Sequence, residues 1–181
     1  MRATEMTNLY HLPLGNDMPY VVPVVIEIPK GTRNKIEYDP HTGVFRLDRV
    51  LYSPVHYPGD YGFIPQTLSE DGDTLDALVI ITDPTFTGCV IMAQPLGVLV
   101  MEDDKGHDEK IIAVPYHDPR FEEVNEITDL RKHTVREVQH FFEVYKELEG
   151  KPTAMLGWHG SARAREIILE AHKRFQAQYG G

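Results

Sequence analysis

The first two thirds of the chain alternate short apolar runs with clusters of Gly, Pro and Asp. Such runs, rich in Val and Ile and bounded by turn residues, are typical of β-strands. Residues 39–43 separate two of the runs and favour a hairpin. Pro23 lies inside the first run, so it requires a sheet edge, a bulge or a place just before the strand. The predicted strands are residues 20–28, 35–38, 44–52, 75–82, 90–101 and 110–114.

The apolar spacing changes in the last third of the chain to that of one helix face. Gly150 and Pro152 end the first predicted helix, and Ser161 is the expected N-cap of the second. The apolar face of the first helix consists of Val135, Val138, Phe141, Phe142, Tyr145 and Leu148, and that of the second of Ala164, Ile167, Ile168, Ala171 and Phe175. The pattern predicts a mainly β (α+β) fold, a small barrel or curled sheet with two C-terminal helices packed outside.

Residues 52–65 lie between the predicted hairpin and the next strand. Three prolines and two glycines give this segment an irregular path. Tyr52, Tyr57 and Tyr61 supply phenol groups that can donate hydrogen bonds to oxyanions. Taken alone, the segment is more simply interpreted as a loop that covers the core with aromatic side chains.

Asp71, Asp73 and Asp76 place three carboxylates within six residues, directly before an apolar run. Two unit charges about 4 Å apart repel by roughly 1 kcal/mol in water, and by about 4 kcal/mol at an effective dielectric near 20. A cation would relieve this repulsion, and oxygen ligands favour Mg²⁺, Mn²⁺ or Ca²⁺ over zinc. An EF-hand loop is excluded because Leu75 stands at its fifth position, and an aspartyl-phosphate signature fits poorly because the apolar run follows. A metal site and a solvated acidic turn remain.

Residues 101–110 form a second acidic segment that joins two predicted strands. On its own this segment is most simply a charged hairpin tip. Both acidic segments, however, lie at strand ends of a small sheet, where they can converge on one mouth. Facing carboxylate clusters would bind several cations, which lower the pKa of a water molecule and hold a phosphoryl group.

The charge balance narrows the possible partners. The chain has 28 acidic and 18 basic residues, a net charge of −10 and a pI near 5.3, which argues against nucleic acid and anionic membranes. Cys89 is the single cysteine, as is usual in a reducing compartment. No apolar stretch of signal-peptide length occurs in residues 1–15, and none approaches a membrane span. We expect a soluble, cytoplasmic protein with one domain, residues 1–181.

Two basic residues of the predicted hairpin are less easily explained as surface residues than the others. Lys35 shares one side of its strand with Glu37 by the period of two, and Arg49 lies between Asp48 and an apolar run. Lys146 lies one step off the apolar face of its helix. Spacing alone therefore makes Lys146 an ordinary lysine at the rim of that face.

Several short segments occur in a diagnostic order. The most specific is D-G-D-x-x-D at residues 71–76, and the others are Lys35-Ile-Glu37, Asp48-Arg49, Tyr57-Pro-Gly-Asp-Tyr61-Gly, residues 97–101 and residues 103–110. Each segment is weak by itself, but together they are hard to obtain by chance. In these segments the chain resembles the soluble family I inorganic pyrophosphatases of the short bacterial type. The resemblance runs over nearly the whole chain, from residue 24 to residue 146.

The resemblance implies a five-stranded OB-like barrel that hydrolyses inorganic diphosphate to two phosphates. The implied cofactors are several Mg²⁺ ions, for which Mn²⁺ or other divalent ions can substitute. By position, Asp73 resembles the general base that accepts a proton from a water bridging two metals. The implied metal-site residues are Asp71, Asp76, Asp103, Asp108, Glu37 and Glu27, the last orienting metal-bound water. The implied phosphate-binding residues are Lys35, Arg49, Tyr61, Lys110, Tyr145 and Lys146, with Tyr57 lining the same cavity.

Three positions depart from the family pattern. Thr74 stands where the signature usually has proline, and Asp104 where glutamate is common. His140 is present on the first predicted helix, but Val144 replaces a second histidine one turn away. The resemblance implies a homohexamer, while the dependence of its assembly on histidine protonation stays open. The alternative functions are a non-catalytic OB-type binding module and an inactive metal-binding relative.

Overall fold

The computed structural model describes residues 8–180, so residues 1–7 and 181 of the predicted domain, and with them the start of segment 1–15, lie outside the described residues. The strands are β1 (Val22–Ile28), β2 (Asn34–Asp39), β3 (Val44–Val50), β4 (Asp60–Ile64), β5 (Leu75–Val79), β6 (Val90–Asp103), β7 (Gly106–Pro115) and β8 (Ala154–Gly160). The α-helices are α1 (Lys132–Val144) and α2 (Ser161–Tyr179), and the short 3₁₀ helices are η1 (Leu9–His11), η2 (Pro119–Phe121), η3 (Ile127–Asp129) and η4 (Glu147–Glu149).

Five strands close into a ring in the order β1-β4-β5-β7-β6, because β6 also pairs with β1. The β5–β7 pair is parallel, and the other pairs of the ring are antiparallel. β8 pairs with β6 beyond the part of β6 that is bonded to β1. β2 and β3 form a separate two-stranded hairpin. The predicted five-stranded barrel is confirmed.

β1 is buried at every position, which explains its nearly continuous apolar sequence. Glu27 interrupts that sequence, and its carboxylate oxygen Oε1 accepts a hydrogen bond of 2.7 Å from the backbone N–H of Tyr38. Pro23 is tolerated because β4 pairs with β1 only from Val25 onward, so β6 is the single neighbour of the strand at that point. Of the three places that the sequence left open for Pro23, the structure shows the first, a position with one neighbouring strand.

β4 lies within the segment that the sequence indicated to be an irregular loop. Its Gly62 faces β1 so closely that a Cβ atom would lie 1.8 Å from the carbonyl oxygen of Val25. Only glycine permits this approach, so a glycine that acts as a turn signal in the sequence is the residue that allows β4 to pair with β1. β8 was also missed, since its seven residues include Gly157 and Gly160 and show no clear alternation.

Two helix boundaries differ from the predictions. α1 ends at Val144, and Leu148 lies on η4 with 62% of its surface exposed rather than on the buried helix face. Ser161 is the first residue of α2 instead of its N-cap, which is Gly160. The backbone N–H of Ser161 donates to Glu126 at 2.8 Å. A distant glutamate therefore satisfies the helix start, which local spacing cannot reveal.

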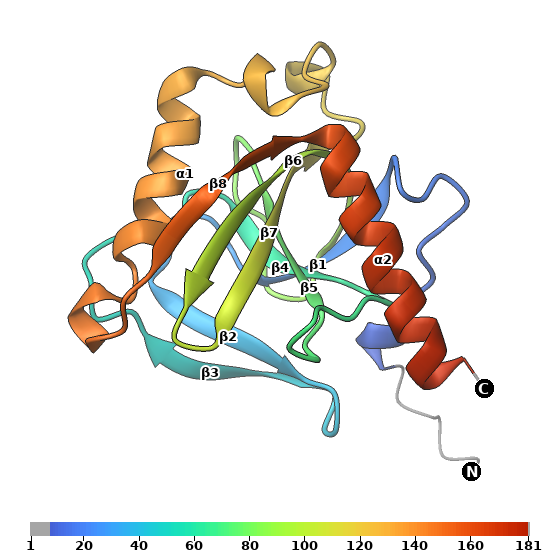
Figure 1. Cartoon of the computed structure of the whole chain (residues 1–181), viewed down its shortest axis with the longest axis horizontal. Helices are drawn as coiled ribbons and strands as arrows, with labels where there is room; N and C mark the ends of the chain where they lie inside the picture. Colours follow the sequence, from blue (N-terminus) through green and yellow to red (C-terminus); the bar gives the residue numbers. More distant parts are fainter. Residues whose placement is uncertain (1–7, 181) are drawn as a thin grey trace.

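The helices cover different parts of the barrel (Figure 1). α2 buries Ala164, Ile168 and their neighbours against side chains of β1, β5, β6 and β7. α1 buries Val138, Phe141 and Phe142 in a second cluster that also contains Tyr57 and Tyr61. The β2–β3 hairpin crosses below the β6–β7 hairpin in the view of Figure 1. Within residues 8–180, no helix is both long and apolar enough to cross a membrane.

Candidate active site

A cavity of about 490 Å³ opens between the β2–β3 hairpin, the barrel and the end of α1. All residues that the sequence analysis singled out for catalysis, metal binding or substrate binding line this cavity. The two acidic segments, residues 71–76 and 103–108, therefore lie on the same side of the molecule. The lining residues among them are Glu27, Lys35, Glu37, Arg49, Tyr57, Tyr61, Asp71, Asp73, Asp76, Asp103, Asp108, Lys110, Tyr145 and Lys146.

The turn before β5 holds the first acidic segment in place. The carboxylate of Asp71 accepts the backbone N–H of Asp73 at 3.0 Å. The carbonyl of Asp73 accepts the N–H of Ser69 at 2.7 Å. Gly72 has a positive φ of 88°, which glycine adopts without strain. The turn thus uses one carboxylate locally and leaves Asp73 and Asp76 at the cavity.

The barrel joins the two acidic segments through the parallel pair of β5 and β7. Asp76 and Lys110 are direct partners in this register. The ammonium of Lys110 lies 2.5 Å from Oδ2 of Asp76 and 2.7 Å from Oδ2 of Asp108, while the phenol of Tyr61 donates to Oδ2 of Asp76 at 2.5 Å. These carboxylates hold the pKa of Lys110 well above its usual range despite its burial. Asp76 and Asp108 thus converge on one cationic position.

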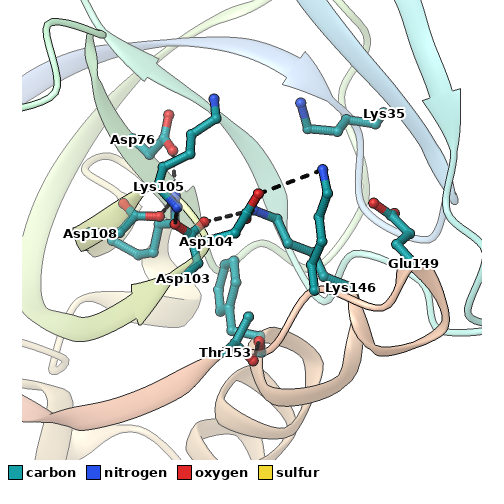
Figure 2. A network of polar contacts seen from close by, with 12 residues as sticks. Lys35, Asp76, Asp103, Asp104, Lys105, Asp108, Lys146, Glu149 and Thr153 are labelled. Atoms are coloured by element: carbon teal, nitrogen blue, oxygen red, sulfur yellow. Dashed lines mark hydrogen bonds and ion pairs between the residues drawn. The ribbon is translucent and has the colours of Figure 1, made fainter.

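A second group of ion pairs lies beside the first (Figure 2). The ammonium of Lys146 lies 2.6 Å from Asp103 and 3.4 Å from Asp104. On the hairpin side, Lys35 pairs with Glu37 and with Asp48. The guanidinium of Arg49 bonds Asp48 at 2.5 Å and Glu149 at 3.0 Å.

Several groups of the cavity have shifted pKa values. Burial raises the pKa of Glu27 from 4.5 to about 8. Burial and the charge of Asp71 raise the pKa of Asp73. Burial raises the pKa values of Tyr57 and Tyr61 well above the usual range, and the charge of Asp76 acts in the same direction on both. The two phenols therefore stay neutral hydrogen-bond donors at neutral pH.

The donor set fits hard divalent cations. The acidic lining consists entirely of carboxylate oxygens, the ligands that Mg²⁺ prefers. Among residues 8–180, no three Asp, Glu, His or Cys side chains are gathered as tightly as around a bound metal ion. The ammonium groups of Lys110 and Lys146 instead lie between the carboxylates. These ion pairs show that the carboxylate oxygens are placed to neutralise positive charge inside the cavity.

The cavity also includes residues that the sequence did not indicate as site residues. Asp48 belongs to the Asp48-Arg49 segment of the resemblance but was given no role, yet it bonds both Lys35 and Arg49. Tyr10 comes from η1 and lines the cavity near Thr74, whose side chain lowers the pKa of the Tyr10 phenol, while burial raises that pKa to about 12 overall. Lys105, His107 and Lys151 lie on the same lining. No sequence pattern marks Tyr10, because η1 reaches the site only through tertiary packing.

The family model for inorganic pyrophosphatase matches residues 24–176. The chain belongs to the inorganic pyrophosphatase family. The inorganic pyrophosphatase of Halalkalibacterium halodurans is 51% identical over 158 residues, which are 87% of this chain and 97% of that protein. That of Thermus thermophilus is 48% identical over 179 residues, which are 97% of this chain and 100% of that protein.

A solved structure of the Thermus thermophilus inorganic pyrophosphatase superposes with a TM-score of 0.92 at 46% identity. The match covers 94% of this chain and 99% of the other. The structure of the Helicobacter pylori inorganic pyrophosphatase gives a TM-score of 0.87 at 42% identity, covering 91% of this chain and 98% of the other. Family membership and the barrel that the sequence suggested are thus confirmed. Tyr10 lies before the first residue of the family match.

Proposed function

We propose that the protein is a Mg²⁺-dependent enzyme that hydrolyses inorganic diphosphate to two phosphates. The observation that carries this proposal is the convergence of two acidic segments and several cationic groups on one cavity. Diphosphate is highly anionic, so a site for it needs both cations and hydrogen-bond donors. Membership of the inorganic pyrophosphatase family supports the same activity.

The cavity carboxylates would hold the divalent cations. The proposed residues are Asp71, Asp76, Asp103, Asp108 and Glu37, with Glu27 orienting water. Bound Mg²⁺ would neutralise phosphate charge and lower the pKa of a water molecule, and Mn²⁺ or another divalent ion would substitute. The Lys110 ion pairs support this assignment, because Asp76 and Asp108 already share one cation. With Mg²⁺ bound to these carboxylates, the Lys110 ammonium would also interact with phosphate oxygens of the substrate.

The basic and phenolic residues would hold the phosphate oxygens. Lys35, Arg49, Lys110 and Lys146 carry the positive charges, and Tyr57, Tyr61 and Tyr145 line the same cavity. Because the raised pKa values keep Tyr57 and Tyr61 protonated, their hydroxyls remain able to donate. Fixed donors of this kind stabilise charge that develops as the bridging bond breaks.

Asp73 would accept the proton. In the reaction, a water oxygen forms a bond to one phosphorus while the bond from that phosphorus to the bridging oxygen breaks, and the water proton passes to a carboxylate oxygen of Asp73. The raised pKa of Asp73 brings its basicity closer to that of the water it serves. Asp73 is suited to this role because the turn leaves its carboxylate at the cavity.

Phosphate release from diphosphate tests the proposed function. The purified protein with diphosphate and Mg²⁺ should release two phosphates per substrate, and excess chelator should stop the release. A nucleoside triphosphate serves as the control substrate. Absence of turnover, or full turnover in chelator, contradicts the proposal.

The assembly and location are part of the same proposal. We expect a cytoplasmic homohexamer built from a single domain, residues 1–181, with no nucleic-acid or membrane partner. Self-association is supported by three exposed apolar side chains, those of Tyr20, Tyr116 and Met92, which are 65%, 47% and 42% exposed. Sedimentation velocity distinguishes hexamer, trimer and monomer.

A further inference from the structure

Lys105 lies at the tip of the β6–β7 hairpin, directly over the candidate active site. Asp103 pairs with Gly106, so Asp104 and Lys105 form a two-residue turn. The backbone N–H of Lys105 donates to Oδ1 of Asp103 at 2.8 Å. Because Oδ2 of the same carboxylate accepts the Lys146 ammonium at 2.6 Å, the position of the turn is tied to the site itself.

The Lys105 side chain is directed into the cavity. It contributes to the cavity lining, and Figure 2 shows it extending from the hairpin tip into the space between Asp76 and Lys35. Lys105 is exposed, so its side chain lies at the mouth, where the cavity meets solvent.

Lys105 differs from the other cations of the cavity in having no ionic partner. Lys35, Lys110, Lys146 and Arg49 each form ion pairs with carboxylates. Among the part of the chain that the structure describes, Lys105 forms none. A paired ammonium shares its charge with its carboxylate, whereas an unpaired one interacts fully with an incoming anion.

The negative charge of the cavity explains why an unpaired ammonium would help an anionic substrate to bind. Carboxylates from both acidic segments line it, and they repel a diphosphate that approaches the mouth. A flexible lysine side chain with three N–H donors at that mouth attracts the anion and follows it inward. The two-residue turn anchors the base of the side chain, so only the side chain has to move.

We propose that Lys105 is a further substrate-binding residue, whose ammonium holds a terminal phosphate oxygen of diphosphate from the hairpin tip. This inference rests on the proposed function and adds a contact to it. The contact is made in both the bound substrate and the transition state. Its loss therefore raises KM and leaves kcat nearly unchanged.

The test compares steady-state hydrolysis of diphosphate by the wild type and by Lys105→Ala, Lys105→Arg and Lys132→Ala. Lys132 is an exposed lysine at the start of α1 and serves as the matched control. Lys105→Ala should raise KM about fivefold, the size of a partly solvated ion pair. Lys105→Arg should restore most of the affinity, and Lys132→Ala should match the wild type.

Binding provides a readout that is independent of turnover. Titration of the Mg²⁺-loaded protein with methylenediphosphonate, which cannot be hydrolysed at the bridge, should show about fivefold weaker binding by Lys105→Ala. Unchanged KM and unchanged analogue binding overturn the proposal, as does a fall in kcat with equal loss of thermal stability. If the wild type releases no phosphate, the proposed function fails, and the analogue titration still decides whether Lys105 binds a diphosphate group.

Discussion

The carboxylate of Asp73 is the one acidic group of the turn that would take up a proton during the reaction. Asp73→Asn keeps the size of the side chain and its hydrogen-bonding shape but removes its basicity. We expect the rate of phosphate release to fall by roughly 10² or more, the usual contribution of a general base. Mg²⁺ binding, measured by calorimetry, should stay nearly unchanged. A near-normal rate would remove Asp73 from this role.

Glu27 makes the stability of the metal-free protein depend on pH. Its pKa is raised from 4.5 to about 8 in the fold, so above pH 4.5 the unfolded chain releases a proton that the folded chain keeps. The free energy of unfolding therefore decreases as pH rises from 4.5 toward 8. Glu27→Gln should remove this contribution, while its amide oxygen still accepts the N–H of Tyr38.

Urea unfolding of both proteins in chelator, at pH about 5 and about 8, measures the effect of Glu27. The wild type should lose more stability between the two pH values than Glu27→Gln does. Equal losses in the two proteins would show that the Glu27 carboxyl titrates in the fold as it does in the unfolded chain.

At the scale of single elements, α2 depends on a residue far away in the chain. Glu126 accepts both the backbone N–H and the hydroxyl of Ser161, and these bonds hold the pKa of Glu126 below its usual range. Glu126→Ala leaves the first turn of α2 without this partner. We expect a loss of about 1 kcal/mol, as for other helix-cap deletions.

Thermal unfolding measures the Glu126 effect as a decrease in Tm of about 2–4 °C. Glu122→Ala, at an exposed position just after η2, is the control and should leave Tm nearly unchanged. The stabilisation by Glu126 is present at neutral pH and is lost as pH falls through its lowered pKa. An unchanged Tm in Glu126→Ala would mean that water satisfies the helix start equally well.

Element prediction succeeded where one chain segment carried its own signal. The Val- and Ile-rich run of β1 and the helical spacing of Val138 and Phe141 depend on burial of one continuous segment. β4 was not predicted because the glycine that brings it close to β1 is also a turn signal. The predicted end of α1 was wrong because Leu148 is apolar yet exposed. Both errors depend on neighbours that are distant in sequence.

The candidate site likewise contains residues that could be predicted from the sequence and residues that could not. Asp71, Asp73 and Asp76 are close in sequence, so their proximity could be predicted directly. Their meeting with the β6–β7 hairpin is now observed, whereas their roles in metal binding and catalysis stay predictions. The contribution of Tyr10 could not be predicted, because η1 reaches the cavity only by tertiary packing. That of Asp48 was missed although Asp48 stands beside Arg49 in the predicted hairpin.

At the scale of the whole molecule, metal binding and folding should be linked. The cavity carboxylates come from segments that meet only in the fold, so Mg²⁺ binds the folded state in preference. At 100 times its Kd, Mg²⁺ should raise the free energy of unfolding by about 2.7 kcal/mol. Scanning calorimetry with and without Mg²⁺ measures the shift. Asp76→Ala should show a smaller rise, and an equal rise would exclude Asp76 as a ligand.

The parallel pair of β5 and β7 brings Asp76 beside Lys110, and the whole of β6 lies between these two strands in sequence. The chain cannot juxtapose these charges by a local turn, since a parallel pair needs a long crossover. Catalytic competence should therefore return late when the denatured protein is diluted into buffer, after the helices have regained their circular dichroism. The time at which turnover returns would then mark the time at which β5 pairs with β7 and the barrel closes.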